Sequence, residues 1–299
     1  MPSSREMRLR IRSIHSISQV TRALQAVSAS KVRKAMQATL ATKPYAEKAW
    51  KVLIHLARQP GHTSLHPLLT TRAEIKKTLV VMISSDRGLS GSYNINVLRK
   101  TLENFAKPAA PVNFVAIGRK GRDMLIRRRL NVIAEFSDLN SPTAFTEVSP
   151  IGHLIVEDFL KGEADQVYLV YTDFHNLLRQ EVIVRKILPL EVEFGSKDDH
   201  SFNVTHHQTQ AVFTYEPDQD ILLDEIIPRF TAMQVYQAIL SAQASEHAAR
   251  MIAMRNATDN AIDLMAALKL EYNKFRQQSI TNEMLDITSG AEALGKSQF

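Results

Sequence analysis

The loop between residues 84 and 94 is the segment of this sequence best placed to bind a phosphate group. It follows an apolar run, precedes a helix-like run and carries Gly88 and Gly91. Backbone amides of a glycine-bearing loop at the start of a helix can hold an anion. The spacing of the two glycines matches neither the three-glycine dinucleotide pattern nor a phosphate loop ending in Gly-Lys-Ser/Thr. We therefore favour a structural loop, capped by Asp86 or Ser90, and its residues are Asp86, Arg87, Gly88 and Gly91.

Other patterns of catalysis and metal binding are weaker still. The connection at residues 118–122 has two glycines and the same ambiguity. His206 and His207 have no carboxylate or histidine three or four residues further on, and Glu246 with His247 is a single pair. The chain has no cysteine, which excludes disulfides, thiolate metal sites and cysteine nucleophiles and suits a reducing compartment. We expect no catalytic residue, no cofactor and no metal.

The net charge of +6 is concentrated in one terminal segment. Residues 1–58 hold twelve basic and two acidic residues, residues 59–216 hold 18 of each, and residues 217–299 hold seven basic and eleven acidic residues. With 44% hydrophobic and 23% charged residues, the composition is typical of a folded protein. The basic surplus therefore belongs to the N-terminal segment alone.

A basic N-terminal helix could bind nucleic acid, an acidic protein surface or only water. Its footprint would include Arg22, Lys31, Arg33 and Lys34, and its charge would attract phosphates. No aromatic residue precedes Tyr45, so the segment offers no stacking surface for bases. A nucleic-acid-binding or scaffold protein built on a basic coiled coil stays as the alternative to docking on acidic protein surfaces.

Glycine and proline divide the chain into three parts. Residues 3–43 and 229–289 contain neither, whereas eight of ten glycines and eight of eleven prolines lie between residues 60 and 217. Long uninterrupted segments predict long helices. No run is long and apolar enough for a membrane helix, and arginines interrupt the N-terminus where a signal peptide would be apolar.

Both terminal segments carry apolar residues at alternating steps of three and four, the repeat of a left-handed coiled coil. The C-terminal repeat is Met251, Met254, Thr258, Ala261, Met265, Leu268, Tyr272 and Phe275, and the N-terminal repeat is Ile17, Val20, Leu24 and Val27. The simplest way to bury both stripes is an antiparallel coiled coil. We therefore expect helices at 1–58 and 211–299 that pack on each other.

The middle of the chain, residues 75–210, alternates between strand-like and helix-like runs. The expected strands are residues 79–83, 112–117, 132–136, 167–171 and 181–188, and the expected helices are residues 94–105, 120–129 and 148–160. This order predicts a Rossmann-like, mostly parallel α/β domain that ends in an antiparallel hairpin. The fold class is therefore α/β plus a long antiparallel coiled coil.

Three parts of the chain resemble one protein family. Residues 19–35, QVTRALQAVSASKVRKA, resemble the N-terminal helix of the gamma subunit of F-type ATP synthases. Residues 244–261, 272–283 and 289–291 resemble its C-terminal helix, and residues 84–94 resemble one of its loops. The resemblance implies the central-stalk rotor of a proton-translocating ATP synthase, which couples proton flow to ATP synthesis or hydrolysis and has no active site.

The resemblance also implies partners and contact residues. The partners are the alpha and beta subunits of a hexameric ring, the epsilon subunit and the membrane c-ring, with no nucleic acid and no small-molecule substrate. Implied contacts with the catalytic ring are Lys31, Arg33, Lys34, Arg276, Gln277, Thr281 and Glu283; the neck contains Leu24 and Gln25; implied contacts with the membrane ring are Phe213, Tyr215 and Glu216.

The sequence departs from the family pattern at three positions. The family commonly has Met where Leu24 stands, Glu where Gln25 stands and Cys where Ser90 stands. Without cysteine or a long insertion near residue 200, the resemblance favours a bacterial enzyme over the thiol-regulated chloroplast form. The expected location is the cytoplasmic face of the bacterial plasma membrane, as a peripheral subunit.

Overall fold

The structure is a computed structural model that describes residues 4–58, 66–72, 74–105, 110–190 and 219–296. Its contacts divide the chain into two compact units. One unit is Ser28–Arg250, and the other combines Met1–Val27 with Met251–Phe299. Both terminal helices therefore contribute residues to both units.

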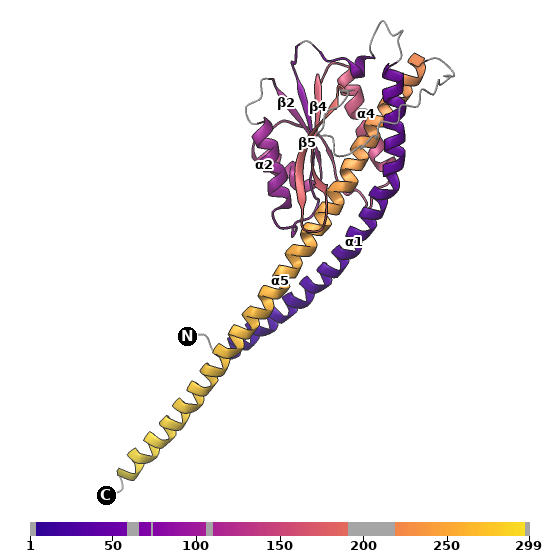
Figure 1. The fold of residues 1–299 in the computed structure, drawn as a ribbon. Helices are drawn as coiled ribbons and strands as arrows, with labels where there is room; N and C mark the ends of the chain where they lie inside the picture. The colour runs from indigo at the N-terminus through magenta and orange to yellow at the C-terminus, as the bar shows by residue number, and fades with distance from the viewer. Residues whose placement is uncertain (1–3, 59–65, 73, 106–109, 191–218, 297–299) are drawn as a thin grey trace. The chain divides into compact units, whose positions relative to one another are not determined.

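The order of elements confirms the alternation expected from the sequence (Figure 1). The helices are α1 Ser4–Arg58, the 3-10 turn η1 Pro67–Leu69, α2 Tyr93–Phe105, α3 Arg119–Arg127, α4 Phe145–Leu160 and α5 Gln219–Lys296. The strands are β1 Thr78–Ile83, β2 Val112–Ile117, β3 Val132–Phe136, β4 Gln166–Phe174 and β5 Gln180–Leu188. Within the described residues, no helix combines the length and apolarity needed to span a membrane.

The five strands form one sheet in the order β3-β2-β1-β4-β5. Neighbouring strands run parallel except β4 and β5, which form an antiparallel hairpin. All six residues of β1 are buried, as expected for a central parallel strand covered on both faces. The prediction of a mostly parallel α/β domain with a terminal hairpin is confirmed.

Helices cover both faces of this sheet (Figure 1). On one face, Leu125 of α3 and Val97 of α2 pack against Met82 and Phe114. On the other face, residues of α4 such as Ile155 share a core with apolar residues of α1 and α5. The packing of α4 on α5 is tight at Gly152, where an added Cβ would lie 2.5 Å from the Cβ of Ala232 and 2.8 Å from its Cα.

In the second unit, the N-terminal part of α1 packs against the C-terminal part of α5. Thr21 lies beside Thr258, with their hydroxyl oxygens 2.6 Å apart, and Arg8 Nε donates a hydrogen bond of 2.7 Å to the hydroxyl of Tyr272. Lower residue numbers on α1 thus pair with higher numbers on α5, so the helices are antiparallel as predicted. The C-terminal repeat is confirmed, because Met254, Thr258 and Ala261 are buried and the later members of the repeat are half-buried.

The N-terminal repeat is not the one expected. Ile17, Val20 and Val27 are each more than half exposed, whereas Ser18, Thr21 and Ser28 are buried. The predicted seam of α1 is therefore wrong by one residue. Small polar side chains replace larger apolar ones along the buried stripe, and the hydroxyls of Thr21 and Thr258 satisfy each other, so their burial is not penalised as that of unpaired groups would be.

A buried carboxylate fastens the start of the sheet. Asp165, just before β4, accepts hydrogen bonds from Arg72 Nη1 at 2.5 Å and from the amides of Lys76 and Lys77 at 2.6 and 2.8 Å. Burial alone would raise the pKa of the Asp165 carboxyl, but these donors outweigh it and lower that pKa below its ordinary value. The charged form of Asp165 is therefore favoured by folding.

We expect Asp165→Asn to lower the free energy of unfolding at neutral pH by about 2 kcal/mol, because charge-assisted hydrogen bonds are lost. A lowered pKa stabilises the fold above the ordinary pKa of aspartate, and this contribution disappears as the pH falls through the lowered value. Urea unfolding at neutral pH and at about pH 3 should show the difference between the two proteins shrinking in acid. Glu163→Gln, which alters an exposed pair with Lys77, is the control and should change little. A pH-independent difference would contradict the assignment.

Candidate functional site

The carboxylate of Asp86, in the loop after β1, accepts hydrogen bonds from two backbone amides of the same chain. Asp86 Oδ1 accepts a hydrogen bond of 3.0 Å from the amide of Arg119, and Asp86 Oδ2 accepts one of 3.0 Å from the amide of Asp138. Arg119 is the first residue of α3, where a bound phosphate would meet free amides in a nucleotide-binding sheet. The chain's own carboxylate occupies that position. Asp86 thus caps α3 rather than the helix that follows its own loop.

The second glycine-bearing connection is equally closed to a ligand. The amide of Gly121 donates a hydrogen bond of 2.8 Å to Ser84 Oγ, and a Cβ on Gly121 would lie 2.4 Å from that oxygen. Gly118 has a positive φ of 97°, and a Cβ there would lie 2.6 Å from the carbonyl oxygen of Ser84. The glycines at 118 and 121 therefore allow close packing of β1 against the start of α3.

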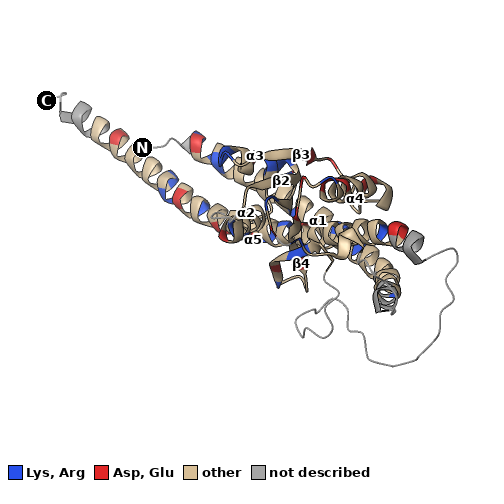
Figure 2. Cartoon of the chain, turned by 90° about the horizontal axis from the view of Figure 1, so that it is seen from above, with Lys and Arg blue, Asp and Glu red and all other residues tan. Residues whose placement is uncertain are grey.

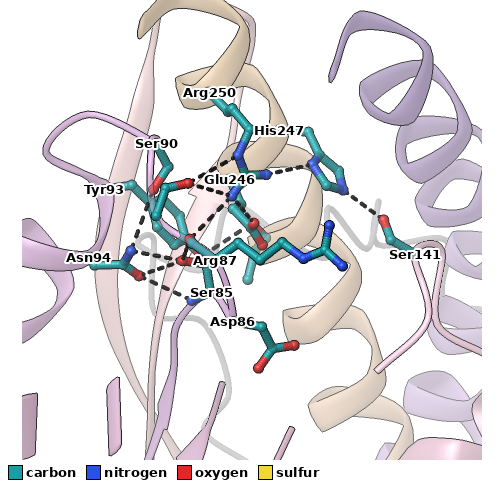
Figure 3. A network of polar contacts seen from close by, with 12 residues as sticks. Ser85, Asp86, Arg87, Ser90, Tyr93, Asn94, Ser141, Glu246, His247 and Arg250 are labelled. Atoms are coloured by element: carbon teal, nitrogen blue, oxygen red, sulfur yellow. Dashed lines mark hydrogen bonds and ion pairs between the residues drawn. The ribbon is translucent and has the colours of Figure 1, made fainter. Parts of the chain in front are cut away.

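Asn94 and Ser85 hold the loop from its other side (Figure 3). The Asn94 side-chain oxygen accepts a hydrogen bond from the amide of Ser85 at 3.0 Å. Ser85 Oγ in turn donates to the carbonyl of Arg87 at 2.7 Å. Because these hydrogen bonds hold the loop, the backbone carbonyls of Arg87 and Gly88 keep a fixed direction.

Arg250 of α5 binds those carbonyls. Its guanidinium donates to the carbonyl oxygen of Gly88 at 3.3 and 3.4 Å and to that of Arg87 at 3.3 Å (Figure 3). The same group forms an ion pair of 2.6 Å with Glu246, one turn earlier, and the two side chains are only 13% and 14% exposed. A mostly buried ion pair on α5 thus joins the helix to the loop after β1.

Electrostatics in this cluster are dominated by burial. Burial raises the pKa of Glu246, and the positive charge of Arg250 opposes that rise. Burial, together with the positive charges of Arg250 and Lys31, lowers the pKa of His247 to about 4. His247 is therefore neutral at neutral pH. Its Nδ1 lies 3.2 Å from Arg250 Nη1 and must accept, so Nε2 carries the proton and donates to Ser141 Oγ at 2.7 Å.

Further side chains of α5 join the ends of the other strands. Ser241 Oγ donates to Asp173 Oδ1 of β4 at 2.7 Å and accepts from the amide of Phe174 at 2.9 Å. Gln243 Nε2 donates to the carbonyl of Asn140 at 2.8 Å and to Thr143 Oγ1 at 2.7 Å, both after β3. One face of α5 is therefore hydrogen-bonded to the ends of three strands.

A cleft of about 290 Å³ lies at this junction. Its charged lining residues are Lys31, Asp86, Arg87, Asp138, Glu246 and Arg250. Three of these residues are basic and three are acidic, so the cleft lacks the uniform charge of an anion or cation site. Among the described residues, no group of three or more His, Asp or Glu could hold a metal ion.

The residues that the resemblance assigned to the catalytic ring lie on exposed helix surfaces. Lys31, Arg33 and Lys34 are exposed on α1, which carries the basic residues of the N-terminal segment (Figure 2). Lys31 also lines the cleft, and its charge lowers the pKa of Glu246. Arg33 and Lys34 do not line that cleft. The three basic residues are therefore not equivalent.

The C-terminal and neck residues lie in the second unit. The first group, Arg276, Gln277, Thr281 and Glu283, is exposed on α5, and the neck residues Leu24 and Gln25 are half-buried. Thr281 Oγ1 donates to the carbonyl of Gln277, within its own helix. Phe213, Tyr215 and Glu216 lie outside the described residues.

Sequence reasoning missed most of the residues that join α5 to the sheet. It noted Glu246 and His247 only as an isolated pair and assigned no role to Ser241, Gln243 or Arg250. The available signal was the run of polar side chains in an otherwise apolar segment. Polar residues in such a position need partners on a neighbouring element.

Comparisons with known proteins agree along the whole chain. A family model described as ATP synthase matches residues 3–294. The ATP synthase gamma chain of Roseiflexus castenholzii is 40% identical over 99% of this chain and 100% of its own, and that of Dehalococcoides mccartyi strain CBDB1 is 41% identical over 98% and 100%.

Solved structures show a similar fold. The central stalk and c-ring structure of the Tetrahymena thermophila mitochondrial ATP synthase contains a chain 25% identical, with a TM-score of 0.58, covering 80% of this chain and 99% of that one. A chain of the Euglena gracilis mitochondrial ATP synthase rotor is 18% identical, with a TM-score of 0.65, covering 93% and 98%.

Proposed function

Because this chain belongs to the ATP synthase gamma chain family, we propose that its helices transmit torque between an ion-driven ring in the membrane and a catalytic ring. The chain is the central-stalk rotor subunit of an ATP synthase. Torque passed in one direction couples proton flow to ATP synthesis, and in the other direction ATP hydrolysis drives the pump. None of the comparisons supports the alternative of a nucleic-acid-binding or scaffold protein.

The observation that carries the torque proposal is the continuity of α5. This helix has 78 residues and contains no glycine between residues 229 and 289. Its Ser241, Gln243 and Arg250 side chains bind the α/β domain, and its later residues form the coiled-coil repeat. A force applied to the domain therefore enters the helix through several hydrogen bonds at once.

The contact residues extend this proposal. Basic Lys31, Arg33 and Lys34 suit acidic lever loops of the catalytic subunits, and exposed polar side chains of α5 suit contacts higher in the ring. These α5 residues are Arg276, Gln277, Thr281 and Glu283, with Leu24 and Gln25 at the neck. Such contacts can bias the ring only by binding its conformations unequally.

The proposal also assigns roles to the three parts of the chain. We assign residues 75–210 to an α/β domain beside the epsilon subunit, residues 1–58 and 211–299 to the shaft, and Phe213, Tyr215 and Glu216 to the c-ring contact. We also propose that the subunit has no catalytic site of its own, and the hydrogen bond from the amide of Arg119 to Asp86 supports this for the loop after β1. It works peripherally at the cytoplasmic face of a bacterial plasma membrane.

Native purification tests the assignment to a complex. When the protein is purified from its own cells under native conditions, it should copurify with two homologous P-loop subunits and a small third subunit. ATP hydrolysis should belong to that complex and be absent from the purified chain. Recovery of a stable monomer alone, or ATP turnover by the chain alone, would contradict the proposal.

We expect reversal of Lys31, Arg33 and Lys34 to Glu to weaken ATP-driven proton pumping by roughly ten-fold or more, because like charges would face the acidic levers. ATP hydrolysis should fall less than pumping, since the ring itself is unchanged. Pumping by inverted membrane vesicles and ATPase activity are measured together. Reversal of three exposed basic residues elsewhere, Arg99, Lys100 and Arg179, is the charge-matched control. Equal pumping by the two variants would refute this role.

A further inference from the structure

The end of α3 carries three consecutive arginines on the surface of the α/β domain. Arg127, Arg128 and Arg129 are all exposed, and the apolar Ile126 and Ile133 beside them in sequence are exposed too. Neither the loop after β1 nor the cleft at α5 includes any of these residues. The function proposed above therefore leaves this patch, Ile126–Arg129 with Ile133, without a role.

Arg129 occupies a backbone position that favours glycine. The amide of Leu130 donates to the carbonyl of Leu125 at 3.1 Å, and the amide of Arg129 donates to that of Ile126 at 2.9 Å. These two bonds define the Schellman motif that ends many helices, and its left-handed residue is usually glycine. Arg129 has a φ of 58° at that position. The chain therefore keeps an arginine where glycine would cause less strain.

The strain is not offset by an ion pair in the described part of the chain. There, neither Arg128 nor Arg129 lies within ion-pair distance of a carboxylate, and Arg127 influences Asp123 only at longer range. The Asp123 carboxylate is instead paired with Arg122 at 2.8 Å. Within the part of the chain that the structure describes, these three guanidinium groups thus keep their donors for a ligand outside the chain.

We propose that this patch binds the anionic head groups of a phospholipid surface. Guanidinium groups bind phosphate oxygens in pairs, and isoleucines beside them can enter the head-group region. A peptide partner would need a groove or a free helix face, and neither the cleft at α5 nor a second cleft, lined by Gln277 and Thr281, includes a residue of the patch. The nearness of a membrane rests on the proposed function, whereas binding to vesicles does not.

Vesicle cosedimentation of the full chain tests the patch. The probes are phosphatidylcholine vesicles with and without about one-third phosphatidylglycerol. Each basic residue near such a surface contributes roughly a five-fold gain in affinity, so Arg127→Gln, Arg128→Gln and Arg129→Gln together should weaken binding to the anionic vesicles by roughly a hundred-fold. Arg99→Gln, Lys100→Gln and Arg179→Gln, which remove the same charge elsewhere, should weaken it far less.

Arg129→Gly separates lost binding from lost folding. Glycine relieves the left-handed strain, so this variant should unfold at a higher urea concentration than the natural chain while binding anionic vesicles more weakly. A variant that is more stable yet binds less cannot be explained by misfolding. A fall in stability would remove the strain argument and with it the support for a ligand-binding arginine.

Three outcomes would overturn the proposal. Equal loss of binding in the patch variant and its charge-matched control would mean that only net charge matters. Binding of the patch variant at the natural level would exclude lipid. If the patch variant binds vesicles as well as the natural chain but assembles poorly onto the membrane sector, the patch binds an acidic protein instead of lipid. The proposed torque function would survive each of these results, because its own test is the composition of the purified complex.

Discussion

Replacement of Gly152 by alanine is expected to lower the free energy of unfolding of the Ser28–Arg250 unit by about 2 kcal/mol. Alanine favours a helix over glycine by up to about 1 kcal/mol, which alone would stabilise α4. Here the new Cβ would lie 2.5 Å from the Cβ and 2.8 Å from the Cα of Ala232. Because a backbone-bound atom of α5 must move, the steric cost exceeds the gain in propensity.

Gly290→Ala is the matched control for this substitution. Gly290 also lies inside a helix, α5, but a Cβ there would have no atom within 4 Å. This variant should be equally or more stable, so the two glycine-to-alanine changes should differ in sign. Urea unfolding followed by circular dichroism measures both. A stabilised Gly152→Ala protein would show that α4 and α5 are less tightly packed than described.

Arg250→Met is expected to cost about 3 kcal/mol of stability and to weaken the coupling of hydrolysis to pumping. Removing one partner of a buried ion pair leaves the other uncompensated, which typically costs about 3 to 5 kcal/mol. Glu246 would then be buried without its ion-pair partner, and the carbonyls of Arg87 and Gly88 would lose their donor. The loop after β1 would no longer be fastened to α5.

The pH dependence of this variant has a definite sign. Without Arg250, the pKa of Glu246 rises further above its ordinary value, so folding favours the protonated acid. The deficit should therefore be greatest at neutral pH and should shrink as the pH falls below the raised pKa. Arg250→Met combined with Glu246→Leu should recover part of the loss, since no charge is then left buried. A double variant as unstable as the sum of both single variants would argue against the pair.

Much of the fold could be predicted because buried parallel strands and long helices leave clear patterns. Residues 79–83 of β1 are a continuous apolar run, and every residue of the strand is buried. The repeat after Met251 could be read directly because α5 there packs on one side only. On α1 the same reasoning failed, because Thr21 and Ser28 are buried while Val20 and Val27 are exposed. Apolar periodicity does not distinguish a stripe that faces a partner helix from one that faces outward.

The polar junction of α5 could not be predicted for a different reason. In the loop after β1, the partners of Arg250 are the backbone carbonyls of residues 87 and 88, and backbone groups carry no sequence signal. Their direction depends on Ser85 and Asn94, whose contacts exist only once the loop is folded. The glycines at 88 and 91 could be noted from the sequence. Whether their loop binds a phosphate depended on Asp86, whose carboxylate accepts a hydrogen bond from the first residue of α3.

The arrangement of α1 has a consequence for the subunit on its own. Over residues 18–28 its buried side chains are Ser18, Thr21 and Ser28, while Ile17, Val20 and Val27 form an exposed apolar line beside them. The helix would bury more apolar surface if it rolled by about one residue, so its native orientation is locally frustrated. An uncovered apolar line on a rod also favours association between copies. The unassembled subunit should therefore tend to aggregate, and prompt assembly into the complex would prevent this.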